Sequence, residues 1–207
     1  MIQASEDCGF RTTVIGAVND FTQSVKEVEN WYEKYHKEDG LTSYELGFHA
    51  EYTTKREILE GISELSKKYH APIYTHNSES ASEVAQCVER TGMTPTVYME
   101  QLGLFEYGGG LYHCVHMSEE DLDVVKRHQI SVITNPASNL KLASGIAPIE
   151  EMLKRNIDLA IGTDGPASNN CLDMFREMFL VTALAKYREN DASAVDATEV
   201  LKMATTG

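Results

Sequence analysis

The chain carries Pro72-Ile73-Tyr74-Thr75-His76-Asn77-Ser78-Glu79, a run of strand-forming residues that passes directly into polar residues and then a helix-like segment. Two further runs repeat this order, and they end in His113-Cys114-Val115-His116 and in Gly162-Thr163-Asp164-Gly165. Short apolar runs followed by helical periodicity are typical of β/α units. Because barrel enzymes keep their chemistry at the carboxyl ends of the strands, the three runs predict a metal site at the mouth of a β/α barrel.

The rest of the chain alternates in the same way between strand-like and helix-like segments. The predicted strands are residues 11–16, 44–49, 72–76, 111–115, 130–134 and 157–162. The predicted helices are residues 22–37, 80–90, 96–103, 172–187 and 197–204, with others starting near Thr54, Ser118 and Pro148. Thr54 with Glu57 and Ser118 with Asp121 have the spacing of N-terminal capping pairs. This alternation favours a parallel sheet with helices outside it.

The length limits how much of a barrel the chain can form. It has 207 residues, enough for one domain with a sizeable core, whereas a closed eight-stranded barrel needs about 250. Six strands are recognisable where such a barrel has eight. We therefore expect an α/β fold, a partial (β/α)8 TIM barrel of parallel strands that corresponds to strands three to eight, over residues 1–207.

The composition excludes several classes of partner. There are 18 Lys and Arg against 32 Asp and Glu, a net charge of −14, which argues against nucleic acid and anionic membranes. No apolar run reaches the roughly 18 residues of a membrane span, and the first residues do not resemble a signal peptide. The four cysteines have no patterned spacing, which favours reduced thiols in a cytoplasmic protein.

His76, Glu79 and Asp164 are candidates for the chemistry of the site. An imidazole can bind zinc or iron, and a carboxylate three residues later could carry a proton, although an ordinary surface loop would also contain such residues. Asp164 ends an apolar strand, where a cation would offset the cost of its charge. Its alternative role is to cap the next helix, for which Ser168 and its two neighbouring asparagines are better placed.

The remaining histidines divide into one candidate and several doubtful ones. His113 and His116 are three residues apart, so on a continuous strand only one can face the site, and we choose His113. His116 is then a loop or packing residue. His49 ends a predicted strand and could bind substrate, although a histidine in such a position, taken alone, is more often structural. Residues 135–145 form a polar segment that could be a lid, a substrate wall or an ordinary loop.

Two long motifs resemble the amidohydrolase superfamily, in particular its S-adenosylhomocysteine/methylthioadenosine deaminases and triazine hydrolases. They are Asn135-Pro136-Ala137-Ser138-Asn139-Leu140-Lys141-Leu142-Ala143-Ser144-Gly145-Ile146-Ala147-Pro148 and Gly162-Thr163-Asp164-Gly165-Pro166-Ala167-Ser168-Asn169-Asn170. The motif around His113 and the segment around His49 and Tyr52 also fit. The resemblance covers essentially the whole chain.

The resemblance implies metal-assisted hydrolytic deamination of adenosine-like or other amino-heterocyclic small molecules. It implies metal ligation by His76 and Asp164, with Glu79 protonating the ring nitrogen and Asp164 taking a proton from metal-bound water. His113 would lie beside the metal and the attacked carbon, and Ser168 would help to hold the acid–base carboxylate. His49 would contact the substrate. The implied cofactor is one divalent metal, with zinc expected first and iron as the alternative, if the site is completed.

The chain departs from the family in its metal ligands. The family uses four, two of them histidines separated by one residue on the first strand, and no such pair occurs here. The first two strands and a flanking small β domain would be missing. Open alternatives are a noncatalytic fragment without a full metal site and a dechlorinating hydrolase of the same branch. We expect no turnover from this chain alone, and homo-oligomers formed through open strand edges.

Overall fold

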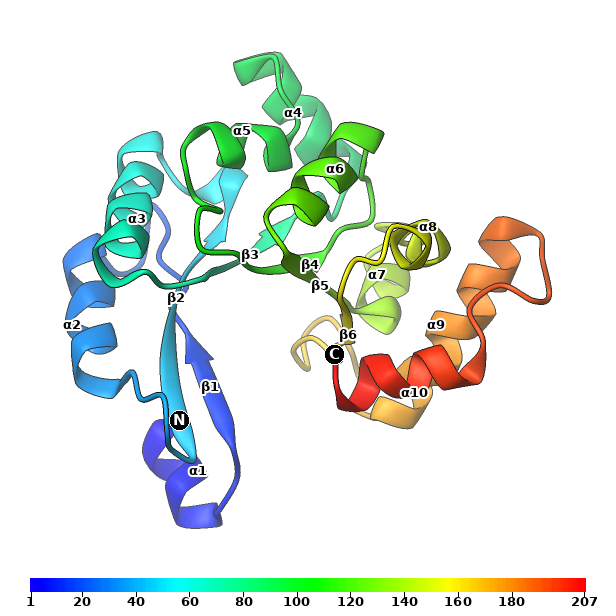
Figure 1. Cartoon of the computed structure of the whole chain (residues 1–207), viewed down its shortest axis with the longest axis horizontal. Helices are drawn as coiled ribbons and strands as arrows, with labels where there is room; N and C mark the ends of the chain where they lie inside the picture. The colour runs from blue at the N-terminus through cyan, green and yellow to red at the C-terminus, as the bar shows by residue number, and fades with distance from the viewer. The chain divides into compact units, whose positions relative to one another are not determined.

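The computed structural model describes residues 1–207 and contains six strands whose order in the sheet is the order of the sequence (Figure 1). The pairs β1–β2 and β5–β6 are parallel. The strands are β1 Thr12–Ile15, β2 Thr42–Ala50, β3 Ile73–Asn77, β4 Gly109–His113, β5 Ile130–Thr134 and β6 Leu159–Ile161. All six predicted strands are therefore present, and the expected α/β architecture is confirmed.

The helices separate the strands along most of the chain. They are α1 Ile2–Cys8, α2 Val25–Tyr35, α3 Arg56–Tyr69, α4 Ala81–Thr91, α5 Pro95–Gln101, α6 Glu119–Arg127, α7 Pro136–Lys141, α8 Ile149–Lys154, α9 Met174–Glu189 and α10 Ala197–Thr205, with a short 3-10 turn η1 at Glu51–Thr53. Of these, α1 and α7 were not predicted. The first has no buried residue, and the second lies in the segment predicted to be a lid, a substrate wall or a loop.

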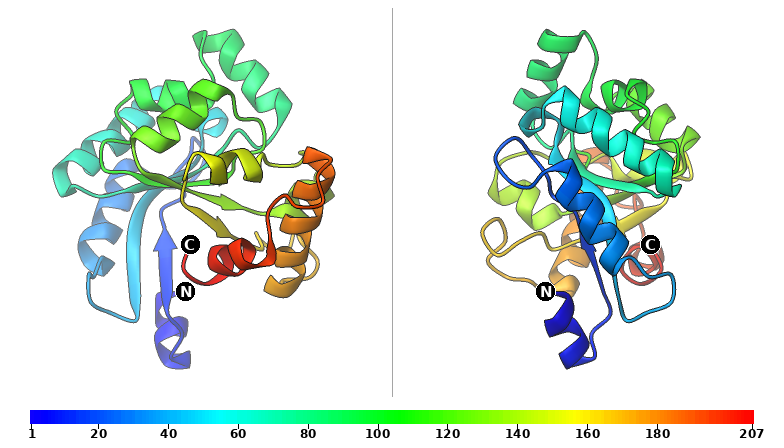
Figure 2. Two further views of the ribbon diagram at one scale, coloured as in Figure 1. Left: turned by 45° about the vertical axis from the view of Figure 1, so that its right-hand side comes forward. Right: turned by 90° about the vertical axis from the view of Figure 1, so that its left-hand side faces the viewer.

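The chain divides into two compact units, which are described separately. Unit one comprises residues 1–75 and 99–109, and unit two comprises residues 76–98 and 110–207. In unit one, α2 and α3 pack on β2 (Figures 1 and 2). Val28 of α2, Ile62 of α3, and Leu46 and Phe48 of β2 are all buried.

One predicted cap in unit one is wrong. Thr54 and Glu57 do not form a capping box, because α3 begins only at Arg56 and its N-cap residue is Lys55. Thr54 ends the 3-10 turn with extended backbone, its amide bonded to the Glu51 carbonyl. The Lys55 amide instead donates to Asp20 Oδ1 at 2.7 Å.

Unit two contains β5 and β6 with the helices that cover them. Val132, Leu159 and Met152 are buried there, and α9 and α10 pack beside β6 (Figure 2). The predicted cap of α6 is confirmed, because Ser118 and Asp121 form a reciprocal capping box. Helix α9 also has an exposed apolar surface, because Phe175 and Phe179 are 80% and 67% exposed.

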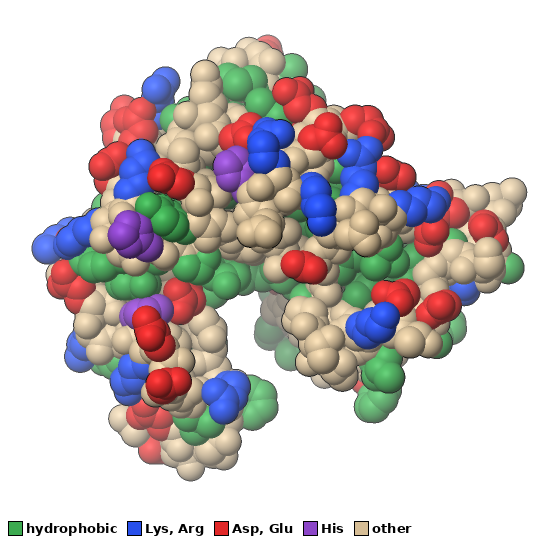
Figure 3. All heavy atoms as spheres, viewed as in Figure 1, with side chains coloured by type: hydrophobic (Ala, Val, Ile, Leu, Met, Phe, Trp, Pro, Cys, Tyr) green, Lys and Arg blue, Asp and Glu red, His purple; other side chains and the backbone are tan.

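The surface carries mixed charge. Figure 3 shows acidic and basic side chains interspersed on the face in view, with acidic ones frequent. No helix combines the length and the apolar character needed to cross a lipid bilayer.

Candidate active site

Four residues of the candidate site region in unit two have left-handed backbone conformations. The φ angles are 48° at Ser78, 71° at His113, 48° at Cys114 and 58° at Asp164. Each such residue costs of order 1–3 kcal/mol and persists only when its surroundings fix it, and such residues concentrate at functional sites. They follow β3, end or follow β4, and follow β6, within the three sequence motifs, and seven other non-glycine residues of the chain also have positive φ.

His113 is the last residue of β4, and its imidazole is almost fully buried, with 1% of the residue exposed. Its Nδ1 lies 2.7 Å from Oδ1 of Asn139. Because an amide oxygen can only accept, Nδ1 carries a proton and donates this hydrogen bond. Nε2 lies 3.8 Å from Oε2 of Glu79. The imidazole of His76 stacks on that of His113, with centroids 5.5 Å apart and planes inclined by 20°.

Glu79 follows β3 and is held from both sides. Its Oε1 accepts a hydrogen bond from the Ser144 hydroxyl at 3.2 Å, and its side chain is 19% exposed. Its backbone amide donates to Oε2 of Glu83 at 2.8 Å, while Oε1 of Glu83 accepts from the Ser78 amide at 2.9 Å. Ser80 and Glu83 also make the capping box that starts α4. The strand–turn–helix junction therefore fixes the backbone from which Glu79 projects.

The carboxylate of Asp164 accepts three hydrogen bonds. Ser138 and Ser168 donate to Oδ2 at 2.6 and 2.7 Å, and the Gly165 amide donates to Oδ1 at 2.7 Å. Burial by itself would raise the pKa of Asp164, but these bonds and the nearby His113 outweigh it, so the pKa is lowered from its usual value. The negative charge of Asp164, for which the sequence indicated no partner within this chain, is thus stabilised by these hydrogen bonds.

Gly162 explains how Asp164 can follow β6 so closely. A Cβ atom at this position would lie 2.3 Å from Oδ1 of Asn135, far inside a normal contact. A larger residue at position 162 would force the buried Asn135 side chain to move. The glycine before Thr163 and Asp164 therefore allows close packing between the two long motifs.

The structure assigns Ser168 a different carboxylate from the one expected. Its hydroxyl donates to Asp164, and the hydroxyl that contacts the acid–base candidate Glu79 is that of Ser144. Ser168 also does not cap the next helix, because the side chain of Asp173 does so for α9. The capping alternative for Asp164 likewise finds no support in its contacts, since Oδ1 bonds the adjacent Gly165 amide in a turn that precedes the helix by several residues.

Helix α7 and the turn after it hold the site together. Ser138 contacts Asp164, Asn139 contacts His113, and Ser144 contacts Glu79. None of these three was predicted as a site residue, although all lie in the segment interpreted as a lid, a substrate wall or a loop. The signal was the run of small polar residues, but their partners are 26 and 65 residues away in sequence, which no local pattern reveals.

Two other histidines have separate surroundings. His116 bonds the Ser144 carbonyl oxygen through Nε2 at 2.7 Å, in agreement with the loop or packing role expected for it. His49 belongs to unit one, where Nδ1 lies 2.8 Å from the Thr53 hydroxyl and the imidazole meets Tyr52 edge-on. Its contact with substrate therefore stays a prediction.

The donor set for a metal is incomplete in this chain. No group of three or more His, Cys, Asp or Glu side chains has an arrangement that could hold a metal ion. His76 and Asp164 remain the two candidate ligands, and structural or catalytic zinc needs at least three protein ligands. The residues present do not fit a metal by themselves.

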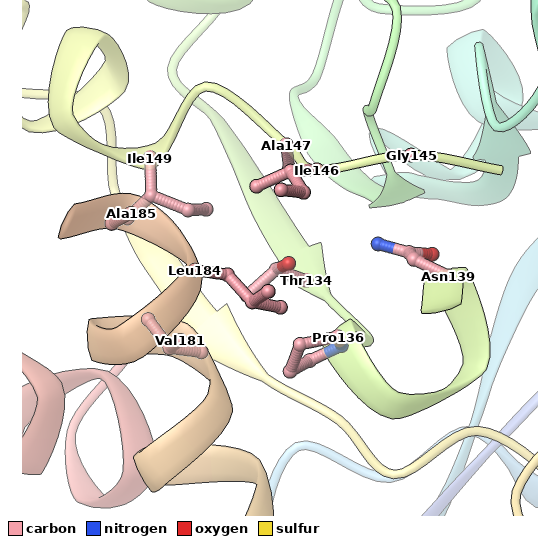
Figure 4. Close-up of a pocket in the computed structure, with 10 residues that line it drawn as sticks. All are labelled: Thr134, Pro136, Asn139, Gly145, Ile146, Ala147, Ile149, Val181, Leu184 and Ala185. Atoms are coloured by element: carbon pink, nitrogen blue, oxygen red, sulfur yellow. The ribbon is translucent and has the colours of Figure 1, made fainter. Parts of the chain in front are cut away.

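A small cavity lies behind α7 and is too small for a substrate. It is lined by residues of β5, α7, α9 and the segment 145–149, including Asn139 and Val181 (Figure 4). Its volume of about 10 Å³ has room for one water molecule at most. The cavity therefore belongs to the packing that supports Asn139.

The whole chain, residues 1–207, matches the model of the amidohydrolase family. The chain belongs to the amidohydrolase family. It is 41% identical over 212 residues to a 5-methylthioadenosine/S-adenosylhomocysteine deaminase of Caldanaerobacter subterraneus subsp. tengcongensis, covering 98% of this chain and 48% of that protein. It is 34% identical over 209 residues to a 5'-deoxyadenosine deaminase of Methanopyrus kandleri, with the same coverage.

Solved structures of other enzymes share the fold. An adenosine deaminase from Xanthomonas campestris with bound zinc superposes with a TM-score of 0.92 at 33% identity, over 99% of this chain and 48% of that one. An atrazine chlorohydrolase from Arthrobacter aurescens, complexed with zinc, gives 0.87 at 24% identity over 99% and 49%, a likeness that shows the fold alone. This amidohydrolase chain therefore has the partial TIM barrel expected, and it spans about half the length of the relatives it matches.

Proposed function

We propose that this chain supplies the acid–base part of a hydrolytic deaminase that acts on adenosine-like small molecules. The observation that carries the proposal is the arrangement around α7, where Glu79, His113 and Asp164 are each held by a residue of one short segment. A carboxyl group beside an imidazole, with a second carboxylate stabilised nearby, is suited to giving and taking protons at a polar heterocycle.

Each residue has a proposed role that follows from its surroundings. Glu79, partly exposed and oriented by Ser144, would deliver a proton to a ring nitrogen of the substrate. His113 would present Nε2 toward the reacting group, because Nδ1 is bonded to Asn139. Asp164, kept ionised by three donors, would accept a proton. His49 is proposed to contact the substrate, and Ser168 to hold Asp164.

The proposed site binds its metal only when further ligands join those of this chain. His76 and Asp164 would be two of its ligands, and further ligands must come from polypeptide that is not among these 207 residues. Zinc is proposed in preference to iron because the related adenosine deaminase of Xanthomonas campestris contains zinc. Reduced thiols support the proposal of a cytoplasmic setting, since all four cysteines are free.

The alternative is a noncatalytic fragment of the same family. It is favoured by the same incomplete donor set, because two ligands do not hold zinc against water. The two proposals differ in what happens when the missing strands are supplied. A fragment that has lost the chemistry stays inactive, whereas an intact acid–base part becomes active.

The test is complementation with the part of the Caldanaerobacter relative that this chain does not cover. The two polypeptides are co-expressed, purified together with added zinc, and assayed for ammonia release from 5'-methylthioadenosine. The proposal predicts turnover that E79Q abolishes and E189Q leaves unchanged, because Glu189 lies at the far end of α9. A folded, zinc-loaded complex without turnover would refute the proposal in favour of the noncatalytic alternative.

A further inference from the structure

Glu177 is a fully buried carboxylate in the first turns of α9 that has none of the roles above. Its Oε2 accepts a hydrogen bond from the Ala137 backbone amide at 3.0 Å, and its Oε1 accepts one from Nδ2 of Asn169 at 2.8 Å. Ala137 lies in α7, and Asn169 lies in the turn after β6. The two oxygens therefore tie together two segments that are about thirty residues apart in sequence.

Both segments carry residues of the candidate site. Ala137 directly precedes Ser138 and Asn139, which bond Asp164 and His113. Asn169 uses the same amide nitrogen to donate to the Thr163 carbonyl at 2.8 Å, immediately before Asp164. A shift of either segment would therefore lengthen bonds made by the site residues themselves.

Both contacts require a hydrogen-bond acceptor, and a carboxylate supplies one with each of its two oxygens. Pro136 has no N–H and the Asn135 side chain does not cap α7. Without Glu177, the Ala137 amide would therefore be an unsatisfied first-turn donor. The side-chain amide of Asn169 also donates an N–H to Glu177. A neutral amide at position 177 would turn one acceptor into a donor and leave two buried donors facing each other.

We propose that Glu177 is a positioning residue that locks α7 to the turn 163–169 and so keeps His113 in one tautomer and Asp164 in its left-handed conformation. The proposal rests on the proposed function only in assuming that His113 and Asp164 act in the deamination reaction. The buried contact between His113 and Asn139 offers a readout that does not require turnover.

The test is nitrogen-15 NMR of His113 in the full 207-residue chain, comparing wild type with E177Q. In wild type we expect a slowly exchanging Nδ1–H proton. In E177Q we expect this proton to exchange roughly tenfold to a hundredfold faster, which corresponds to about 1.4–2.8 kcal/mol at 1.4 kcal/mol per factor of ten. E189Q, on the same helix, is the matched control for charge.

A general loss of stability is separated from positioning by two further variants. V200A removes buried volume in α10 and should leave the His113 signal unchanged. If E177Q does not fold, E177D is judged by the same criteria, because it keeps the charge and loses the reach to one segment.

Wild-type exchange in E177Q, or equal loss of the signal in V200A, would overturn the proposal. Failure of complementation to give ammonia would instead refute the proposed function and leave this result standing, since the NMR measurement uses the chain alone.

Discussion

The contact between His113 and Asn139 should be one of the strongest side-chain couplings in unit two. The two polar atoms are 2.7 Å apart, and the residues are 1% and 2% exposed, so neither group has water to replace its partner. Leaving one buried polar group unsatisfied costs about 1–3 kcal/mol, while removing both partners can be nearly neutral. N139L and H113F should each lower the free energy of unfolding, and the double variant should lower it by less than their sum.

The expected coupling energy is about 1–3 kcal/mol in a double-mutant cycle. Phenylalanine at position 113 also has to adopt the left-handed backbone of His113. The cost of this strain cancels in the cycle, because it is the same in H113F and in the double variant. The assay must report on unit two, whereas the single tryptophan, Trp31, lies in unit one. Native-state hydrogen exchange of the Val132 amide, which bonds the Asp158 carbonyl at 2.9 Å, serves this purpose.

Additivity would refute the reasoning. If the two single effects sum to the double effect within about 0.5 kcal/mol, the two side chains act independently and α7 does not orient His113. A cycle between H113F and V200A is the matched control, and it should be additive because Val200 lies in α10 and not in α7.

Three further predictions concern charge and association. S138A should raise the pKa of Asp164, because it removes one donor to the carboxylate, and carbon-13 NMR of that carboxyl measures the change. Burial raises the pKa of Glu83, so its contribution to stability is complete below the unfolded pKa of about 4.3 and is lost as pH rises through the folded pKa. The urea midpoint of the wild type should therefore fall from about pH 4 upward, and that of E83Q should fall by less. An equal fall in the two proteins would contradict this. F175S/F179S should reduce self-association in analytical ultracentrifugation, because both rings are largely exposed, and a wild type that stays monomeric would count against it.

The alternation of elements was predictable from the sequence because each strand carries a short β-branched or aromatic run and most helices an apolar face. β5 was predicted over residues 130–134, as the structure has it. The cap at Ser118 was predictable because donor and acceptor are three residues apart. Thr54 failed because the chain there continues a turn, and local spacing does not show where a helix begins.

The site was predictable only as far as the strand ends that carry it. His76, Glu79, His113 and Asp164 were predicted as candidates because each lies at or just beyond the end of an apolar strand. Their supporting residues were not, because a bond such as that from Ser144 to Glu79 spans 65 residues and depends on the tertiary fold. The short helix α7 was missed for a related reason: contacts from Glu177 of α9 stabilise its first turn, and its own sequence supplies no side-chain cap.

The most direct test of the account is ammonia release from 5'-methylthioadenosine by the purified 207-residue chain with added zinc, measured beside the complemented complex. The account predicts no turnover by the chain alone, since it brings only two candidate metal ligands. It predicts metal-dependent turnover once the part of the relative that this chain does not cover is present. Robust zinc-dependent ammonia release by the chain alone would contradict the claim that these residues form only part of a metal site.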